Sequence, residues 1–361
     1  MSRWVAAAGA LVVSLDSMMN IAFPAIAVAF AGGAAADQIG HVAVFRAGVA
    51  LSVVAFAMGG VAPSFAWLLI ARIVQGFAGG LIYGTAPALT TLGAPAAVRG
   101  RRLGFLGAAM GLGLLGSLPA GALVESFGWR AVYHVRVPLA LAVLVWAALT
   151  RAEPVERERK PVALGDLTRG SVLRAGALSF VARGAIFAIW LLAPFYLVET
   201  RGLGAFVGGF FFMLTPLGTT VAAPLAGRLA DRVGPSAPAV AGLAVEAVGL
   251  AALGFVGGST PLALVALALF VAGFGLGFFE VPNMTTIMTA FPAGQQGAAG
   301  GLSFLARTLG VVTGVAVAGQ IVAARTAAVG FPGAFAESLL VAALAVAAAA
   351  AVALAGTRGR R

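Results

Sequence analysis

Long apolar segments make up most of this chain, and they restrict its possible folds more than any other feature. Each segment has about twenty residues or more, the length that a helix needs to cross the apolar core of a bilayer. In that core only a helix satisfies its own backbone hydrogen bonds over such a length. The sequence therefore predicts an all-α polytopic membrane protein with about eleven transmembrane helices, at residues 4–31, 41–62, 66–91, 103–124, 130–149, 171–198, 203–226, 236–257, 261–287, 296–324 and 334–355.

The amino-acid composition supports this class and excludes others. Of the 361 residues, 61% are hydrophobic and only 10% are charged, whereas a soluble domain carries about 25% charged residues. A soluble enzyme, a disordered protein and a nucleic-acid-binding protein are therefore excluded. The chain has no cysteine and only two histidines, so no disulfide, thiolate site, zinc centre or iron centre is expected. We predict a protein that is not an enzyme and that uses no metal and no cofactor.

One hydrophilic interval divides the apolar segments into two groups. Residues 151–170 form the only polar stretch of any length, and they carry both acidic and basic side chains. We therefore expect an N-terminal helical bundle of five spans at 1–150, a linker at 151–170 and a C-terminal bundle of six spans at 171–361. The 50 glycines suit close packing of helices in lipid.

The basic residues are distributed unevenly among the loops. One set of alternate loops holds only Arg130, Arg201 and Arg325. Loops rich in arginine and lysine stay in the cytoplasm, so the net charge of +11 is a signal of topology, and no nucleic-acid partner is expected. The linker and the C-terminus are predicted to be cytoplasmic, and the basic set comprises Arg3, Arg99, Arg101, Arg102, Arg151, Arg157, Arg159, Lys160, Arg169, Arg174, Arg228, Arg232, Arg358, Arg360 and Arg361.

A short motif occurs twice and indicates two related halves. The pattern G-x-x-x-D-x-x-G spans residues 33–40 and again residues 227–234. Two apolar segments of its own half precede the second copy, but only 4–31 precedes the first, so the first half is one helix short. Residues 1–36 also resemble a signal peptide, but their apolar stretch exceeds the usual length of about 7–15 residues, and we expect a retained helix.

In the repeated motif and in several other motifs, the chain resembles the major facilitator superfamily, in its branch of drug:proton antiporters. Leu15–Pro24 is similar to the first-helix motif of that branch, and both copies of G-x-x-x-D-x-x-G are similar to the loop after the second helix of each half. Residues 72–76 resemble the fourth-helix motif, residues 111–138 the antiporter motif of the fifth helix, and residues 304–316 the eleventh helix of multidrug exporters. The resemblance covers nearly the whole chain and implies two helical bundles that alternate in access around a central cavity.

Three features depart from the family pattern. The second helix is absent, because the first-helix motif leads almost directly into residues 33–40. His41 stands where a basic run is usual, which weakens the expected gating salt bridges. The antiporter motif has Gly116-Ser117 in place of Gly-Pro, and its proline comes later. By resemblance, the antiporter motif comprises Gly113, Gly116, Pro119 and Gly121.

Two charged residues inside apolar segments are candidates for proton coupling. Asp16 lies in the middle of the first segment, where a carboxylate costs about 2.5–3.5 kcal/mol to insert, so it should face a wet cavity or a partner. Arg72 lies within 66–91, and its guanidinium cannot lose its proton. The functional interpretation, which depends mostly on the resemblance, is that Asp16 carries the coupling proton and that Arg72 tunes it. Hydrogen bonding that serves helix packing alone is the alternative for both.

Further polar residues within the segments are candidates for a substrate cavity. Asn20 follows Asp16 by one helical turn, so the two share a helix face. In the second half, polar residues lie near Phe187 and Phe210–Phe212, and aromatic walls with a few charges suit amphipathic organic cations or anions. Rings that face lipid or the protein core are the alternative, and Glu246 has no evident role. The predicted cavity residues are Asn20, Gln75, Arg183, Trp190, Glu280, Asn283 and Arg307.

The repeated motif predicts a gate at the cytoplasmic side. A carboxylate at a span end can stabilise the N-terminus of a helix and can pair with an arginine across the two bundles. Simple capping of a loop is the alternative. The predicted gating residues are Gly33, Asp37, Gly40, Gly227, Asp231, Arg232 and Gly234.

The predicted function is secondary active transport, namely proton-coupled export of small amphipathic organic molecules or drugs by alternating access. The sequence contains no ATPase motif, so an ion gradient must supply the energy, and the carboxylates favour protons without excluding Na⁺. The alternatives are export of a single metabolite, a transport-impaired sensor or interaction protein, or a truncated gene model. We expect a monomer that crosses a bacterial inner membrane many times, with the lipid bilayer, protons and a small-molecule substrate as its partners.

Overall fold

The computed structural model describes residues 32–115, 123, 124, 126–149, 166 and 168–358. Within these residues the secondary structure is helical, without strands, as the sequence predicts. Residues 32–39 form a helix. The elements that follow are α3 (His41–Gly60), α4 (Phe65–Thr91), η1 (Ala96–Val98), α5 (Arg99–Leu115), α7 (Ala131–Leu149), α9 (Gly170–Phe195), η2 (Tyr196–Thr200), α10 (Ala205–Phe212), α11 (Leu214–Val233), α12 (Ser236–Gly254), α13 (Leu262–Ala290), η3 (Ala293–Gln295) and α14 (Gln296–Arg358).

Most of the predicted spans coincide with helices. Eight helices of the described chain are long and apolar enough to cross a membrane. One of them, α14, bends at Gly330, where φ is 69° and Pro332 follows, so its two limbs correspond to the predicted segments 296–324 and 334–355. The predicted segment 203–226 is instead divided at Met213 into α10 and α11. The segment 4–31 lies outside the described residues.

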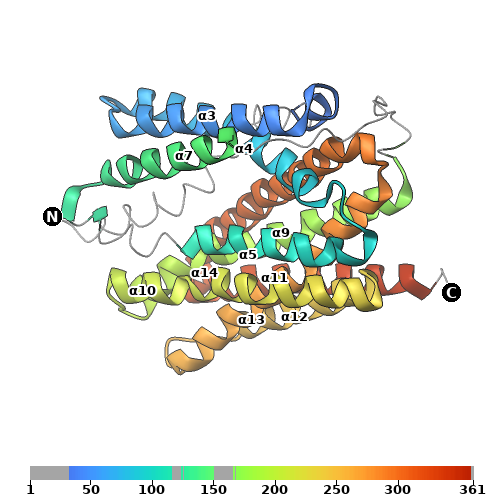
Figure 1. Ribbon diagram of the computed structural model, residues 1–361. Helices are drawn as coiled ribbons and strands as arrows, with labels where there is room; N and C mark the ends of the chain where they lie inside the picture. Colours follow the sequence, from blue (N-terminus) through green and yellow to red (C-terminus); the bar gives the residue numbers. More distant parts are fainter. Residues whose placement is uncertain (1–31, 116–122, 125, 150–165, 167, 359–361) are drawn as a thin grey trace.

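The helices run side by side, mostly along one common direction (Figure 1). In the first half, α3 packs along both α4 and α7. In the second half, α13 packs along α11 and α12, while α9 and α12 pack against α14. Two helices of the first half reach the second: α5 packs along α11, and α4 contacts α14. These cross-contacts bring α4, α5, α9, α11, α13 and α14 around one central region.

The largest buried core lies in the second half, with α9 at its centre. Ile186 and Ile189 of α9 are almost fully buried, as are Leu250 of α12 and Phe335 in the second limb of α14. The rings of Tyr196 and Phe335 stack with centroids 4.7 Å apart. This packing holds α9 and α14 in a fixed relation, and both helices contribute side chains to the central region.

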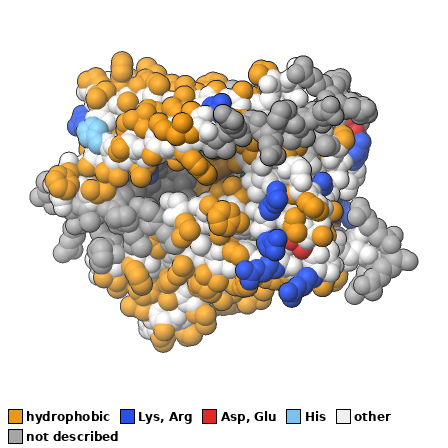
Figure 2. Space-filling view, viewed as in Figure 1, with side chains coloured by type: hydrophobic (Ala, Val, Ile, Leu, Met, Phe, Trp, Pro, Cys, Tyr) orange, Lys and Arg blue, Asp and Glu red, His pale blue; other side chains and the backbone are white. Residues whose placement is uncertain are grey.

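On the face seen in Figure 2, the described surface is largely apolar, as expected for a protein surrounded by lipid. On α7 the side chains of Leu139, Trp146 and Leu149 are 62%, 72% and 77% exposed. Such side chains would be a liability in water but are stable against lipid tails. Arginine side chains gather toward one end of the visible face.

The repeated motif has a different local structure from the expected loop. Its first seven residues are helical in both copies, at 33–39 and at 227–233, which is the last part of α11. Only the final glycine leaves the helix, with φ of 120° at Gly40 and 83° at Gly234. A positive φ strains residues with a side chain, so glycine at this place ends the helix. Asp37 and Asp231 are therefore held rigidly within a final helical turn.

Candidate functional site

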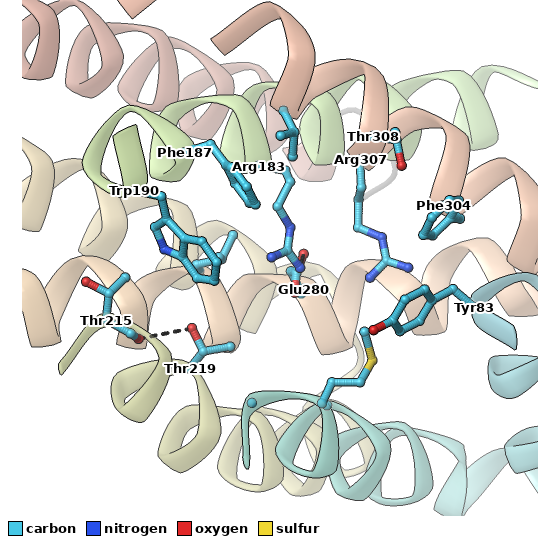
Figure 3. A pocket seen from close by; sticks show the side chains of 15 residues that line it. Tyr83, Arg183, Phe187, Trp190, Thr215, Thr219, Glu280, Phe304, Arg307 and Thr308 are labelled. Atoms are coloured by element: carbon cyan, nitrogen blue, oxygen red, sulfur yellow. Dashed lines mark hydrogen bonds and ion pairs between the residues drawn. The ribbon is translucent and has the colours of Figure 1, made fainter. Parts of the chain in front are cut away.

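A cavity lies between helices of both halves of the chain (Figure 3). Its empty volume is about 1080 Å³, part of which is open to the surroundings. The helices α4, α5, α9, α11, α13 and α14 all contribute to its wall. The lining residues are Tyr83, Gly107, Met110, Gly111, Arg183, Phe187, Trp190, Thr215, Thr219, Leu276, Glu280, Phe304, Arg307, Thr308 and Val311.

The spacing of the lining residues follows the helical period. On α9, Arg183, Phe187 and Trp190 stand four and three residues apart, which puts them on one face. On α14, Phe304 and Arg307 repeat this spacing of three. The two helices can approach closely because Gly310 and Gly314 have no side chain. A Cβ at either position would overlap a backbone carbonyl of α9. Arg183 and Arg307 therefore project into the same space.

An ion pair crosses the cavity wall between α9 and α13. Arg183 pairs with Glu280, and their side chains are only 15% and 17% exposed. A partly desolvated pair of this kind keeps most of its attraction, because little water is present to screen it. The pair fixes one positive and one negative group beside the ring of Phe187 (Figure 3).

Arg307 occupies a different environment. Its Nε donates a hydrogen bond of 3.3 Å to the carbonyl of Ser303 in its own helix. In Figure 3 its guanidinium points into the cavity beside Tyr83. The rings of Tyr83 and Phe304 stack there, with centroids 5.4 Å apart and planes 13° from parallel. The cavity thus has an aromatic wall next to a guanidinium.

Two further polar groups of the wall have unused hydrogen-bonding capacity. The indole N–H of Trp190 and the hydroxyl of Thr215 are buried, and neither has a hydrogen-bond partner among the described residues. By contrast, the hydroxyl of Thr219 donates to the carbonyl of Gly273 at 2.9 Å. Unpaired buried polar groups are costly, and both of these atoms are buried within the wall rather than exposed to the cavity.

The structure brings four predicted cavity residues together, namely Arg183, Trp190, Glu280 and Arg307. Asn283 lies away from the lining: its amide nitrogen donates to the carbonyl of Ala175 at 2.9 Å and to the hydroxyl of Ser179 at 2.7 Å, which joins α13 to α9. Asn20 lies outside the described residues, as does Asp16.

Arg72 and Gln75 lie on α4, outside the cavity lining. Arg72 is 5% exposed and donates a hydrogen bond of 3.0 Å to the side-chain oxygen of Gln75. Its guanidinium carbon lies 5.0 Å from the ring centroid of Tyr133 on α7. A second arginine, Arg136, lies one turn beyond Tyr133 and 5.8 Å from the ring of Phe56. The two arginines and their aromatic partners join α3, α4 and α7.

Each aspartate of the repeated motif caps a helix of the other half of the chain. The carboxylate of Asp231 accepts hydrogen bonds from the backbone N–H groups of Gly100 at 2.7 Å and Arg101 at 2.8 Å, in the first turn of α5. The carboxylate of Asp37 accepts those of Gly297 and Ala298, both at 2.9 Å, in the first turn of α14. A negative charge there is favoured by the helix dipole and satisfies unpaired N–H groups.

The first glycine of each motif copy allows these caps to form. A Cβ on Gly33 would overlap the carbonyl of Gly297, and a Cβ on Gly227 would overlap that of Gly100. His41 is fully buried, with its Nε2 3.1 Å from the Asp37 carboxylate, so this aspartate keeps a basic neighbour. Gly40 and Gly234 end the helices, while Arg232 is exposed in the last turn of α11. These contacts join the two halves of the chain at this end of the bundle.

The antiporter motif is described only in part. Gly116, Pro119 and Gly121 lie outside the described residues, and a Cβ on Gly113 would meet no atom within 4 Å. The close approach of α5 to the second half instead depends on a series of small residues that the sequence analysis did not single out. A Cβ on Gly104 would lie 2.7 Å from the carbonyl of Ala223, and one on Gly111 would overlap the hydroxyl of Thr220.

Other lining residues were also missed, chiefly Tyr83, Thr215, Thr219 and Phe304. Phe304 could have been found, because it precedes Arg307 by three residues. Glu246 lies outside the lining but is fully buried in α12, and both of its carboxylate oxygens lack a hydrogen-bond partner among the described residues. Its backbone packs against Gly275 of α13.

The family model described as Major Facilitator Superfamily matches residues 5–315. The chain belongs to the major facilitator superfamily. As a member it is a multi-pass membrane carrier of small molecules and not an enzyme.

Individual proteins of this superfamily are similar along most of the chain. The Tetracenomycin C resistance and export protein of Streptomyces glaucescens is 28% identical over 85% of this chain and 68% of its own length. The Multidrug resistance protein Stp of Mycobacterium tuberculosis is 26% identical over 80% of this chain and 65% of its own. The solved structure of the proton:xylose symporter XylE has a TM-score of 0.75 at 18% identity, covers 97% of this chain and 86% of that chain, and agrees with it in fold.

Proposed function

We propose that this facilitator exports small amphipathic organic molecules in exchange for protons, by alternating access. Residues 1–150 and 171–361 would act as two bundles joined by the linker 151–170. The protein would work as a monomer in the bacterial inner membrane, with the linker and the arginine-rich loops on the cytoplasmic side. The likeness to two proteins named for drug resistance supports this substrate class.

The observation that supports the proposal is the cavity between the two halves, together with the hydrogen bonds that join the halves at one end. Its wall combines aromatic rings with the charges of Arg183, Glu280 and Arg307, as an amphipathic molecule requires. At one end, Asp37 and Asp231 each join a helix of one half to a helix of the other. Breaking both caps would open that end, and alternating access requires such a reversible closure.

Proton coupling is assigned to Asp16, with Arg72 as the residue that tunes it. A carboxylate within a span can load and release a proton as its surroundings alternate between wet and closed. Arg72 is buried and permanently charged, and its contacts with Gln75 and Tyr133 hold the charge in place.

The test is transport driven by a proton gradient in everted membrane vesicles. Vesicles that contain the protein should take up a fluorescent amphipathic dye when their interior is acidified, and the substitution Asp16→Asn should abolish this uptake while the amount of folded protein stays the same. Wild-type uptake in the Asp16→Asn variant would overturn the assignment of Asp16. Absence of uptake by the wild-type protein across a broad panel of dyes would overturn the exporter function itself.

A further inference from the structure

We propose that the cavity selects amphipathic aromatic anions, whose charged group pairs with Arg307 and whose ring packs against Tyr83 and Phe304. The inference rests on the proposed function in that it names the substrate class of the same cavity. Three observations support it: the balance of charge in the wall, the orientation of Arg307, and the aromatic rings beside that residue.

The charged groups of the wall do not balance. Arg183, Arg307 and Glu280 are the charged residues among the described lining residues, so the sum is one positive charge. Glu280 is already paired with Arg183. A cation in the cavity would therefore meet no free carboxylate among these residues, whereas an anion would meet the guanidinium of Arg307.

Arg307 is held ready to bind an acceptor. Among the described residues, its hydrogen bond uses Nε alone, which donates to the carbonyl of Ser303 in the same helix. The terminal nitrogens face the cavity beside Tyr83 (Figure 3). A guanidinium presents two parallel N–H groups to a carboxylate and remains charged at any physiological pH, so it favours a planar anionic group.

The aromatic requirement comes from the wall next to Arg307. Tyr83 and Phe304 stack face to face and belong to different halves of the chain, on α4 and α14. Phe187 and Trp190 form a second stacked pair with centroids 4.8 Å apart. A flat ring can pack against such faces at little cost in conformational entropy. A ring bound beside Tyr83 and Phe304 would contact both halves at once.

The experiment measures binding to the purified full chain in phosphatidylcholine nanodiscs, which contain no anionic headgroup to compete. Radiolabelled 1-naphthoate is the probe, and three unlabelled compounds compete with it: 1-naphthylmethylamine, 1-naphthalenemethanol and cyclohexanecarboxylate. The amine reverses the charge, and the alcohol removes it. Cyclohexanecarboxylate keeps the charge but lacks the aromatic face. We expect naphthoate to bind about tenfold or more tightly than the amine and the alcohol, since a hydrogen-bonded charge pair contributes at least this factor. It should bind about threefold or more tightly than cyclohexanecarboxylate, which keeps the charge but loses the aromatic contact.

Substitutions then locate the anion. Arg307→Gln should weaken naphthoate binding about tenfold or more and leave naphthalenemethanol binding unchanged. The naphthoate affinity of Arg307→Lys should lie between those of Arg307→Gln and the wild type. The control Arg325→Gln makes the same change on the same helix, at an exposed residue paired with Glu337, and should bind as wild type does.

Several results would overturn the inference. Equal or tighter binding of the amine would exclude anion selectivity, and wild-type naphthoate affinity in Arg307→Gln would exclude Arg307 as the partner. If Arg307→Gln does not fold, the charge series on the wild type and the lysine variant still decide the question. Because binding is measured without a proton gradient, a failure here is distinguishable from a failure of proton-driven transport.

Discussion

Asp231 and Gly100 are joined across the two halves of the chain by a hydrogen bond of 2.7 Å, in which the backbone N–H of Gly100 donates to the Asp231 carboxylate. Asp37 and Gly297 repeat this relationship at 2.9 Å. In both places the aspartate stands four residues after a glycine that packs against the same partner glycine. The two halves are therefore joined twice by the same local arrangement.

We predict that Asp231→Asn favours opening at this end. The amide keeps one acceptor oxygen but loses the charge that the helix dipole and two N–H groups stabilise, and a charge-assisted bond contributes about 1.5–3 kcal/mol. The ratio of open to closed protein should rise by about tenfold or more. The measurement uses a cysteine substituted for Thr219 in the cavity wall. Its rate of reaction with a water-soluble maleimide is followed in everted vesicles.

Glu337→Gln is the matched control, because it removes a carboxylate that is paired only with the exposed Arg325. Its labelling rate should equal that of the parent protein. A rate in Asp231→Asn no faster than in this control would show that the cap does not hold the closed end.

Gly227→Ala should prevent the same closure by a steric route. A Cβ there would overlap the backbone carbonyl of Gly100, which cannot move without shifting α5. The same substitution at Gly209 of α10 would meet no atom within 4 Å and serves as the control. We expect faster labelling at Thr219 and a lower melting temperature for Gly227→Ala alone. Equal behaviour of the two variants would refute the role of this contact.

Two glutamates on neighbouring helices, Glu280 and Glu246, should respond differently to the same substitution. Glu280→Gln breaks the pair with Arg183 and should lower the free energy of unfolding by about 1–3 kcal/mol. Glu246→Gln removes a carboxyl whose oxygens have no partner among the described residues, so it should leave stability unchanged or raise it. Thermal melting in detergent compares the two. An equal loss in both variants would mean that Glu246 is a structural partner as important as Glu280.

Substitution of Arg72 separates its charge from its shape. Arg72→Lys keeps the charge but loses the planar group that bonds Gln75 and lies over Tyr133, so dye uptake should be partly retained. Arg72→Ala should be inactive. Proton-driven uptake in everted vesicles is the measurement, and equal activity of wild type and both variants would reduce Arg72 to a packing role.

Much of the architecture could be predicted from the chain because the bilayer constrains it locally. A long apolar segment such as 66–91 or 261–287 has one stable conformation in lipid, and α4 and α13 occupy nearly those residues. One interruption was harder to predict. The turn of α14 at Gly330 lies in the gap predicted between 296–324 and 334–355, but the division of 203–226 at Met213 was not predicted, because hydropathy alone does not show where an apolar segment is interrupted.

The sequence by itself determined the helical class, the positions of most spans, the charged residues within them and the twofold motif, since each of these follows from hydropathy or local spacing. Only the tertiary structure decided which of these residues meet. Arg183 and Glu280 pair from α9 and α13, whereas Asn283, one turn from Glu280, turns instead to α9 backbone and Ser179. Spacing along one helix fixes the face on which a side chain lies. The partner opposite that face depends on how closely helices approach, and here glycines such as Gly310 and Gly104 set that approach.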